Sequence, residues 1–153
     1  MPLTSALVAF LHHLAAFTVV ATLVIEHALF ARELPLSLAR KLVRIDLYYG
    51  ISAGLLVLVG FLRVFYFEKG PAYYFHDGWF IAKISLFALV GLVSIYPTRV
   101  FLGWRTALRA GVAPVVAEHQ ARAVRLCLML ELAGIVGILL AAPLMARGFG
   151  YFG

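Results

Sequence analysis

Ionisable side chains, which are energetically unfavourable in lipid, interrupt the most apolar part of the N-terminal sequence. The stretch FLHHLAAFTVVATLVIEHALF, residues 10–30, is apolar enough for lipid, yet it contains His12, His13, Glu26 and His27. An ionisable group within a bilayer costs at least a few kcal/mol, so such groups tend to face the interior of a bundle and to mark function. Imidazole and carboxyl groups there can ligate a haem iron, hold another metal ion or pass protons.

Two further charged side chains, Arg63 and Lys83, extend this set. Counted from the expected helix ends, Lys83 and the pair His12 and His13 lie at depths that agree within about 6 Å. Histidine and a neutral lysine amine can both ligate haem iron, and burial favours the neutral amine. The pattern predicts one b-type haem, with His12 or His13 as an axial ligand and Lys83 as the other ligand or a catalytic base. Arg63 would hold a propionate.

Simpler interpretations exist for each of these residues. The two histidines can form hydrogen bonds between helices, and Arg63 and Lys83 can extend their charged ends to the headgroups. A two-haem arrangement is disfavoured: His13 and His27 are 14 residues apart, or ~21 Å along one face, but no other segment has matching histidines. His76 is interpreted as a solvated turn residue, with a reserve role as a ligand.

A second titratable group is expected at the opposite end of the spans. The acidic and imidazole side chains of this group can pass protons, or they can hold zinc or iron. Glu26 is also a candidate catalytic residue. Alternatively they form charge pairs with arginines at the membrane rim, except Glu131, which is deep enough to require protonation or a partner on another helix. The group comprises Glu26, His27, Asp46, His119 and Glu131, and the arginines are Arg44, Arg105, Arg122 and Arg125.

Composition places the whole chain in a membrane. Of its 153 residues, 64% are hydrophobic and 13% are charged, whereas a soluble domain has about 25% charged residues. The single cysteine, Cys127, excludes an internal disulfide and a cysteine-based metal cluster. The net charge of +6 lies mostly in two connections between apolar runs, which indicates membrane topology and not nucleic-acid binding.

Four apolar runs must position the titratable groups. We expect one all-α domain over residues 1–153, a four-helix membrane bundle with helices at 4–31, 45–67, 78–102 and 120–146. The basic residues gather in the first and third connections, so the positive-inside rule places both termini outside, in the periplasm.

Small and aromatic residues predict how the helices pack and where they end. Small residues allow close contact between helices in lipid, and aromatic residues collect at the two interfaces. The small residues are Gly50, Gly54, Gly60, Gly91, Gly134, Gly137 and Ala141. The aromatic residues are Tyr66, Phe67, Tyr73, Tyr74, Phe75 and Trp79 on the outer side, and Tyr48, Tyr49, Tyr96 and Trp104 on the inner side.

Three stretches carry a resemblance to a known family: LHHLAAF, RIDLYYGISAG…GFLRVFYFEKGPAYY and WFIAKISLFALVGLVSIYPTRVFLGWR. Together they resemble the bacterial four-helix membrane family named domain of unknown function 2214, over nearly the whole chain. That family implies a membrane fold and no established activity.

A more distant resemblance concerns function. A histidine early in the first helix, the Gly-x-x-Arg sequence that ends at Arg63, and the Trp-x-x-x-Lys sequence that ends at Lys83 are similar to HemJ-type protoporphyrinogen oxidases and copper-resistance D membrane proteins. In the HemJ type, the histidine and the lysine are tied to haem b and activity. The resemblance implies these roles for His12, or its neighbour His13, and for Lys83.

The sequence thus predicts a multi-pass protein of the bacterial inner membrane that binds haem b and serves a redox step. Its redox partner would be a quinone, a porphyrinogen or another protein, and Glu26, Asp46 and Glu131 would carry protons to the cytoplasm. A small proton-coupled or metal-ion transporter and a structural subunit of a membrane complex are the alternatives. Homo-oligomers are compatible with each of them.

Overall fold

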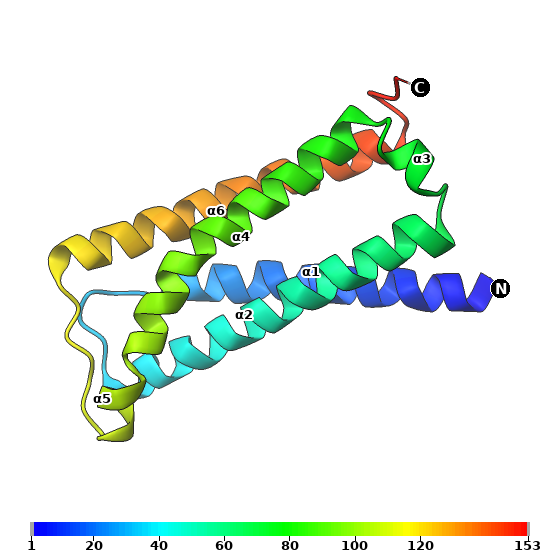
Figure 1. Cartoon of the computed structure of the whole chain (residues 1–153). Coiled ribbons are helices and arrows are strands. Elements are labelled where there is room, and N and C mark those ends of the chain that lie inside the picture. The colour runs from blue at the N-terminus through cyan, green and yellow to red at the C-terminus, as the bar shows by residue number, and fades with distance from the viewer. Residues whose placement is uncertain (1, 153) are drawn as a thin grey trace.

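The computed structural model describes residues 2–152 and is built from helices (Figure 1). No strand occurs in this range apart from one isolated bridge between Asp77 and Tyr151. The elements are α1 (Pro2–Leu29), α2 (Leu36–Leu62), a π-helical turn η1 (Arg63–Phe67), α3 (Pro71–Tyr74), α4 (Gly78–Gly103), α5 (Arg105–Arg109) and α6 (Glu118–Ala146). The expected all-α, four-helix architecture is confirmed.

The start of the second long helix differs from the sequence prediction. The helix was expected from residue 45, but α2 begins at Leu36, directly after Pro35, whose carbonyl accepts hydrogen bonds from the backbone N–H groups of Leu38 and Ala39, both at 3.0 Å. The basic run was assigned to a loop because of its charge. In the structure it forms a helical turn that buries Ala39 and Leu42 and exposes the charged side chains to solvent.

The four long helices form two antiparallel pairs. Helix α1 packs along α2, and α4 packs along α6. Figure 1 shows the pairs close together at the end that carries the α1–α2 connection and α5, and diverging toward the end that carries both termini and α3. We call the first the basic end, residues 30–44 and 99–125, and the second the terminal end.

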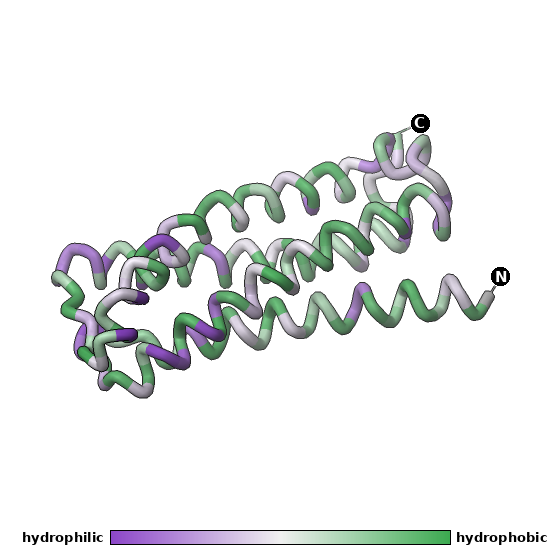
Figure 2. The backbone as a smooth tube through the Cα atoms, turned by 60° about the horizontal axis from the view of Figure 1, so that its bottom comes forward, coloured by the Kyte–Doolittle hydropathy of each residue, from purple (hydrophilic) through white to green (hydrophobic). Residues whose placement is uncertain are grey.

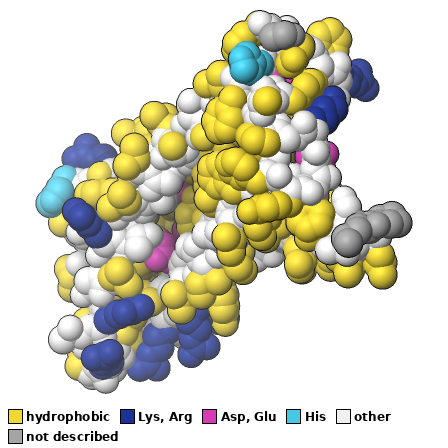
Figure 3. Space-filling model, turned by 45° about the vertical axis from the view of Figure 1, so that its right-hand side comes forward, with side chains coloured by type: hydrophobic (Ala, Val, Ile, Leu, Met, Phe, Trp, Pro, Cys, Tyr) yellow, Lys and Arg dark blue, Asp and Glu magenta, His cyan; other side chains and the backbone are white. Residues whose placement is uncertain are grey.

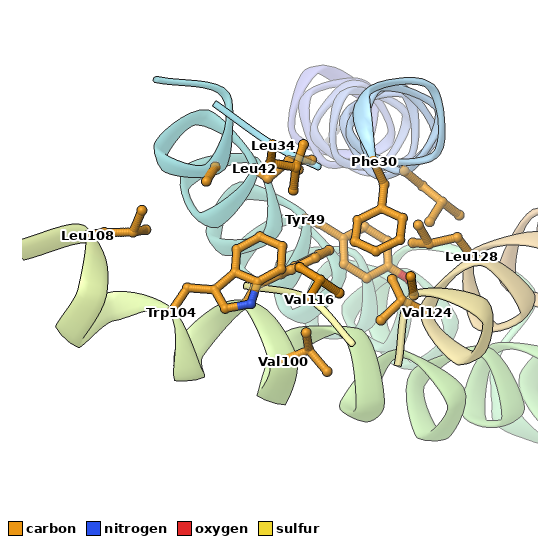
Figure 4. Packing of buried hydrophobic residues seen from close by; sticks show 14 of the residues in the cluster. Phe30, Leu34, Leu42, Tyr49, Val100, Trp104, Leu108, Val116, Val124 and Leu128 are labelled. Carbon is orange, nitrogen blue, oxygen red and sulfur yellow. The ribbon is translucent and has the colours of Figure 1, made fainter. Parts of the chain in front are cut away.

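The apolar core joins the two pairs toward the basic end (Figure 4). Phe101 is fully buried, and its ring centroid lies 6.0 Å from that of Phe30 and 5.0 Å from that of Trp104. Trp104 is therefore a core residue and not the interfacial anchor that was expected. A smaller apolar cluster of Val64, Tyr74 and Phe80, with Met145 packed against it, lies at the terminal end.

Two of the predicted small-residue contacts hold α4 against α6. A Cβ atom at Gly134 would collide with the Val90 side chain, and one at Gly137 would lie 3.0 Å from Leu86 Cδ1. The same expectation is wrong for Gly50, Gly54 and Gly91, because within residues 2–152 no atom beyond their own helix approaches such a Cβ within 4 Å. These three glycines face outward.

The outer surface of the bundle is apolar and is suited to contact with lipid. Four segments, Leu3–Leu29, Leu36–Phe67, Gly78–Arg109 and Glu118–Ala146, are long and apolar enough to cross a bilayer, and an 18-residue stretch in each has a mean hydropathy of 2.1, 1.9, 2.0 and 2.2 respectively. Figure 2 shows apolar residues along the long helices and hydrophilic ones concentrated at the basic end. Large apolar side chains such as Phe17 and Leu140 point outward, as a membrane protein requires.

The terminal end is closed on one side by the C-terminal residues. Backbone hydrogen bonds of 3.0 Å join Gly78 to Gly150 and Phe152 to His76, and the Tyr73 and Tyr151 rings stack with centroids 4.8 Å apart. Asp77 begins α4 by accepting hydrogen bonds from the backbone N–H groups of Trp79 and Phe80. This arrangement fixes the first turns of α4, which carry Lys83.

Candidate functional site

A cavity of about 380 Å³ lies between the two helix pairs at the terminal end. Its size falls within the ~300–1,000 Å³ common for sites that hold small molecules and cofactors. His12, His13, Arg63 and Lys83 all line it. The structure thus brings together the four residues that the sequence singled out, from α1, η1 and α4.

On the α1 side, His12 is half-buried and faces α2. A Cβ atom at Gly60 would lie 3.3 Å from His12 Cε1, so the absence of a side chain at Gly60 gives the imidazole its room. His12 Nδ1 is buried and has no hydrogen-bond partner among the residues that the structure describes. Buried polar atoms usually have a hydrogen-bond partner, so the environment of this nitrogen is unusual.

His13 is more exposed and lies at the edge of the same cavity. Its Nδ1 lies 2.7 Å from the Ala9 carbonyl oxygen, one turn earlier on α1. With the proton on Nδ1, this nitrogen donates to the carbonyl and Nε2 keeps its lone pair, which is the tautomer that metal-ligating histidines adopt. The two imidazole centroids are 6.0 Å apart and their planes are nearly perpendicular, at 85°.

Lys83 reaches the cavity from α4. The side chain is half-buried, and its Nζ lies 5.7 Å from the centroid of the Phe80 ring. Within residues 2–152 no carboxylate lies within 4.0 Å of Nζ. A lysine held in an apolar wall without an acidic partner has its amine available to a ligand.

Arg63 occupies the first position of the π-helical turn and forms an ion pair with Glu68. Both residues line the cavity. A π-helix widens the backbone spiral and brings residues five apart together, which explains a contact that α-helical spacing does not predict. The charge of Arg63 is thus compensated within the chain, and Glu68 is a residue of the site that the sequence analysis missed.

Two more residues of the cavity wall were not predicted as site residues. Tyr74 is only 8% exposed and packs with Val64 and Phe80, although it was expected at the membrane interface. Burial raises the pKa of the Tyr74 phenol, so this hydroxyl stays neutral over a wide range of pH. Met145, from α6, brings a thioether, which is a soft ligand found in some haem proteins.

His76 does not belong to this cavity. It follows α3 and is exposed, and its Nδ1 lies 2.7 Å from the Ala72 carbonyl oxygen, with its ring against Phe152. The interpretation of His76 as a turn residue agrees with this position.

The second predicted group is only partly assembled. The carboxyl groups of Glu26, Asp46 and Glu131 are buried in the bundle, with relative exposures of 1%, 6% and 1%. His27 and His119 are exposed instead, so the histidines do not join the acids. Among residues 2–152 no set of three or more histidine, cysteine or acidic side chains is arranged to hold a metal ion.

Hydroxyl groups, and not arginines, contact the buried acids. The Tyr49 hydroxyl donates to Glu131 Oε2 at 2.8 Å, and the Thr98 hydroxyl donates to Asp46 Oδ1 at 2.7 Å. Glu26 Oε1 and Glu131 Oε1 have no partner among the described residues. None of these acids forms an ion pair with an arginine among the described residues, where Arg32 and Arg122 both pair with Glu118, and Asp46 has only a longer-range interaction with Arg105.

The fold and the cavity define the class of this protein: a four-helix membrane bundle with an intramembrane cavity lined by basic and imidazole groups. The chain matches the model of a family described as predicted membrane protein (DUF2214) over residues 4–150, and it belongs to that family. No curated protein and no solved structure matches it.

Proposed function

We propose that the protein binds one haem b in the terminal-end cavity and serves a redox step in the membrane. The observation that supports this most is the convergence of His12, His13, Lys83 and Arg63 on one cavity within a helix bundle. Bundle cores of this kind are common cofactor sites. When bound, haem would supply one-electron chemistry.

The residues present fit such a group. His12 and His13 place two imidazoles on one wall of the cavity, and Lys83 places an amine on another. Because the His13 ring is held by the contact of its Nδ1 with the Ala9 carbonyl oxygen, His13 would be the more suitable residue to hold the haem iron. Lys83 would be a second ligand or a base that takes a proton from a substrate.

The remaining wall suits a flat apolar ring with acidic substituents. Phe80 and Phe87 from α4 and Ile138 from α6 supply apolar contacts that exclude water. Arg63 offers a guanidinium to a propionate, with Glu68 sharing it or moving aside. Tyr74 adds a neutral hydroxyl that can donate one hydrogen bond.

The second half of the proposal is a proton path from the buried carboxyl cluster, which we define as Glu26, Asp46 and Glu131 with Tyr49. The cluster takes one member from α1, two from α2 and one from α6, and it lies between the cavity and the basic end. Carboxyl groups with unpartnered oxygens next to a hydroxyl can pass a proton without large movement. In the bacterial inner membrane, with both termini in the periplasm, this path would lead to the cytoplasm.

Redox chemistry at this depth suits a quinone, a porphyrinogen or a membrane-bound partner protein as electron donor or acceptor. The HemJ-type resemblance of Trp79-x-x-x-Lys83 supports haem binding more than it supports one of these substrates. A proton-coupled transporter is the second candidate, because Glu26 and Glu131 are buried carboxyl groups without full hydrogen bonding.

The test is the absorption spectrum of protein purified from cells supplied with haem precursor. We expect a Soret band and reduced-minus-oxidised bands of the b type, which His13→Ala abolishes and which His12→Ala and Lys83→Ala shift or abolish. His76→Ala, outside the cavity, is the matched control and should leave the spectrum unchanged. Folded protein that stays colourless and takes up no added haemin would overturn the proposal, and proton movement by such protein in vesicles would favour the transporter.

A further inference from the structure

A second cavity, at the basic end, is lined by arginines. It is shallow, has a volume of about 400 Å³ and lies between α2 and α5. We call it the arginine pocket, and it is lined by Arg40, Val43, Arg44, Arg105, Leu108 and Arg109. The four arginines form two pairs spaced four residues apart, so each pair lies on one face of its helix and the two faces meet across the pocket. Figure 3 shows lysine and arginine side chains gathered at this end.

The folding of the chain, and not only its composition, brings these charges together. The Arg40 guanidinium donates to the Leu108 carbonyl oxygen at 2.9 Å and so connects α2 to α5. Trp104, buried in the core directly before α5, anchors the other side of the same short helix. The positive-inside rule explains why basic residues lie at this end, but it does not require α5 to place two of them against α2.

No direct ion pair within the described residues balances the charge of the arginine pocket, although Arg105 interacts at longer range with the buried Asp46. Within residues 2–152, no carboxylate lies within 4.0 Å of any of its four guanidinium groups, and the ion pairs present involve Arg32, Arg63 and Arg122. Like charges one helical turn apart repel each other. An anion in the pocket would reduce this repulsion.

Phosphate is the anion that this geometry suits. Guanidinium groups bind phosphate oxygens in pairs of parallel hydrogen bonds, and a set of four can surround one phosphate diester. Val43 and Leu108 add an apolar floor. The pocket residues belong to the beginning of the Leu36–Phe67 segment and the end of the Gly78–Arg109 segment, so we expect them at the depth of lipid headgroups. Basic pockets of this kind between spanning helices bind anionic lipids.

We propose that the arginine pocket is a binding site for the headgroup of an anionic phospholipid, with the phosphate between the arginines of α2 and α5 and the upper acyl chain against Val43 and Leu108. Bound lipid would fix α5 and the adjoining connection to α2. The proposal is independent of the haem proposal, because it involves other residues at the opposite end of the bundle.

The experiment measures lipid binding to protein delipidated in detergent. Short-chain phosphatidylglycerol and phosphatidylcholine are titrated, with bound lipid counted by native mass spectrometry and the midpoint of thermal unfolding recorded. We expect saturable binding of phosphatidylglycerol with a rise in the midpoint, and at least a tenfold weaker effect for phosphatidylcholine. Arg44→Gln with Arg109→Gln should weaken phosphatidylglycerol binding about tenfold, and this variant keeps the Arg40 bond to Leu108.

The matched control is Arg99→Gln with Arg125→Gln, which removes two exposed charges from the same end outside the pocket. It should bind phosphatidylglycerol as the unaltered protein does. Equal loss in the control would mean general charge attraction, and would overturn the site. Full competition by inorganic phosphate at matched concentration would assign the pocket to free phosphate and overturn the lipid proposal. If the double variant in the pocket loses its helical circular dichroism signal, Arg105→Gln alone is measured in its place, with the same expected result.

Discussion

The Tyr49 hydroxyl donates a hydrogen bond to Glu131 Oε2 at 2.8 Å, and this bond connects the two helix pairs of the bundle. Tyr49 lies on α2 and Glu131 on α6, and their side chains are 4% and 1% exposed. Loss of this bond should reduce stability more than loss of a surface hydrogen bond, because the other oxygen of Glu131 has no partner among the described residues. Removal of the tyrosine hydroxyl would leave a buried carboxyl group without any hydrogen bond.

Tyr49→Phe should therefore destabilise the protein by about 1–3 kcal/mol, the cost of a buried polar group that loses its partner. The measurement is thermal unfolding in detergent, followed by circular dichroism. Tyr48→Phe is the control on the adjacent residue, which is 57% exposed and should change stability little. Equal midpoints for the two variants would show that the bond between Tyr49 and Glu131 contributes nothing.

The carboxyl cluster should be selectively labelled by an apolar carbodiimide, which enters the bilayer and reacts with carboxyl groups in apolar surroundings. We expect mass spectrometry to find the label on Glu26 or Glu131, both buried, and not on Glu118, whose side chain is 63% exposed to water. Glu26→Gln with Glu131→Gln should abolish the labelling, and it should slow any proton uptake coupled to the redox step. Label confined to Glu118 would contradict a proton path through the cluster.

Hydropathy predicted the number of long helices, and three of their starts within about two residues, because a spanning segment must be apolar over a length that the bilayer sets. The start of α2 was missed because the first turns of this helix extend into water, and their charged residues give the segment the composition of a loop. The similar depth of His12 and Lys83 was predictable from the residue count along their helices, whereas their convergence on one cavity depends also on side-chain direction. The Arg63–Glu68 pair was not, because it depends on a π-helical turn that has no sequence signal.

Side-chain direction was the other unpredictable quantity. Tyr48 and Tyr49 look equivalent in the sequence, yet only Tyr48 faces outward, because one residue corresponds to about 100° of helix rotation. Gly54 and Gly134 look equally suited to helix contact, and only Gly134 meets another helix. Which face of a helix meets a neighbour depends on the packing of all four helices, and composition does not determine it.

Gly134→Ala should destabilise the α4–α6 pair, because the added methyl group collides with Val90 on the opposite helix. Overpacking of this kind costs about 1–3 kcal/mol. The control is Gly91→Ala on α4, where the new Cβ meets nothing within 4 Å and a gain in helix propensity is expected. Thermal unfolding in detergent should separate the two variants, and Gly134→Ala with Val90→Ala should recover part of the loss.

The buried phenol of Tyr74 should make the stability of the folded protein depend on pH in the alkaline range. Burial raises the pKa of its phenol above the value of about 10 in an unfolded chain, so the folded state holds this proton more tightly. The stabilisation is complete below about pH 10 and is lost as the pH rises through the pKa of the folded state. Tyr74→Phe should flatten the alkaline fall of the unfolding midpoint, whereas Tyr66→Phe, at a residue 77% exposed, should leave it unchanged. Identical alkaline profiles for both variants would contradict a buried phenol at Tyr74.

Substitutions of Gly60 test the cavity most directly, because Gly60 lies against the candidate ligand His12 and is not itself a candidate ligand. A Cβ atom at this position would lie 3.3 Å from His12 Cε1, so Gly60→Ala should push the imidazole by a few tenths of an ångström, and Gly60→Val should displace it further. If His12 contacts bound haem, the Soret maximum and the midpoint potential should shift in Gly60→Ala, and haem occupancy should fall in Gly60→Val. Gly54→Ala lies on the same helix with open space around its new methyl group and should have neither effect. A spectrum that responds to His13→Ala but not to either Gly60 variant would assign the iron to His13 and limit His12 to the wall of the cavity.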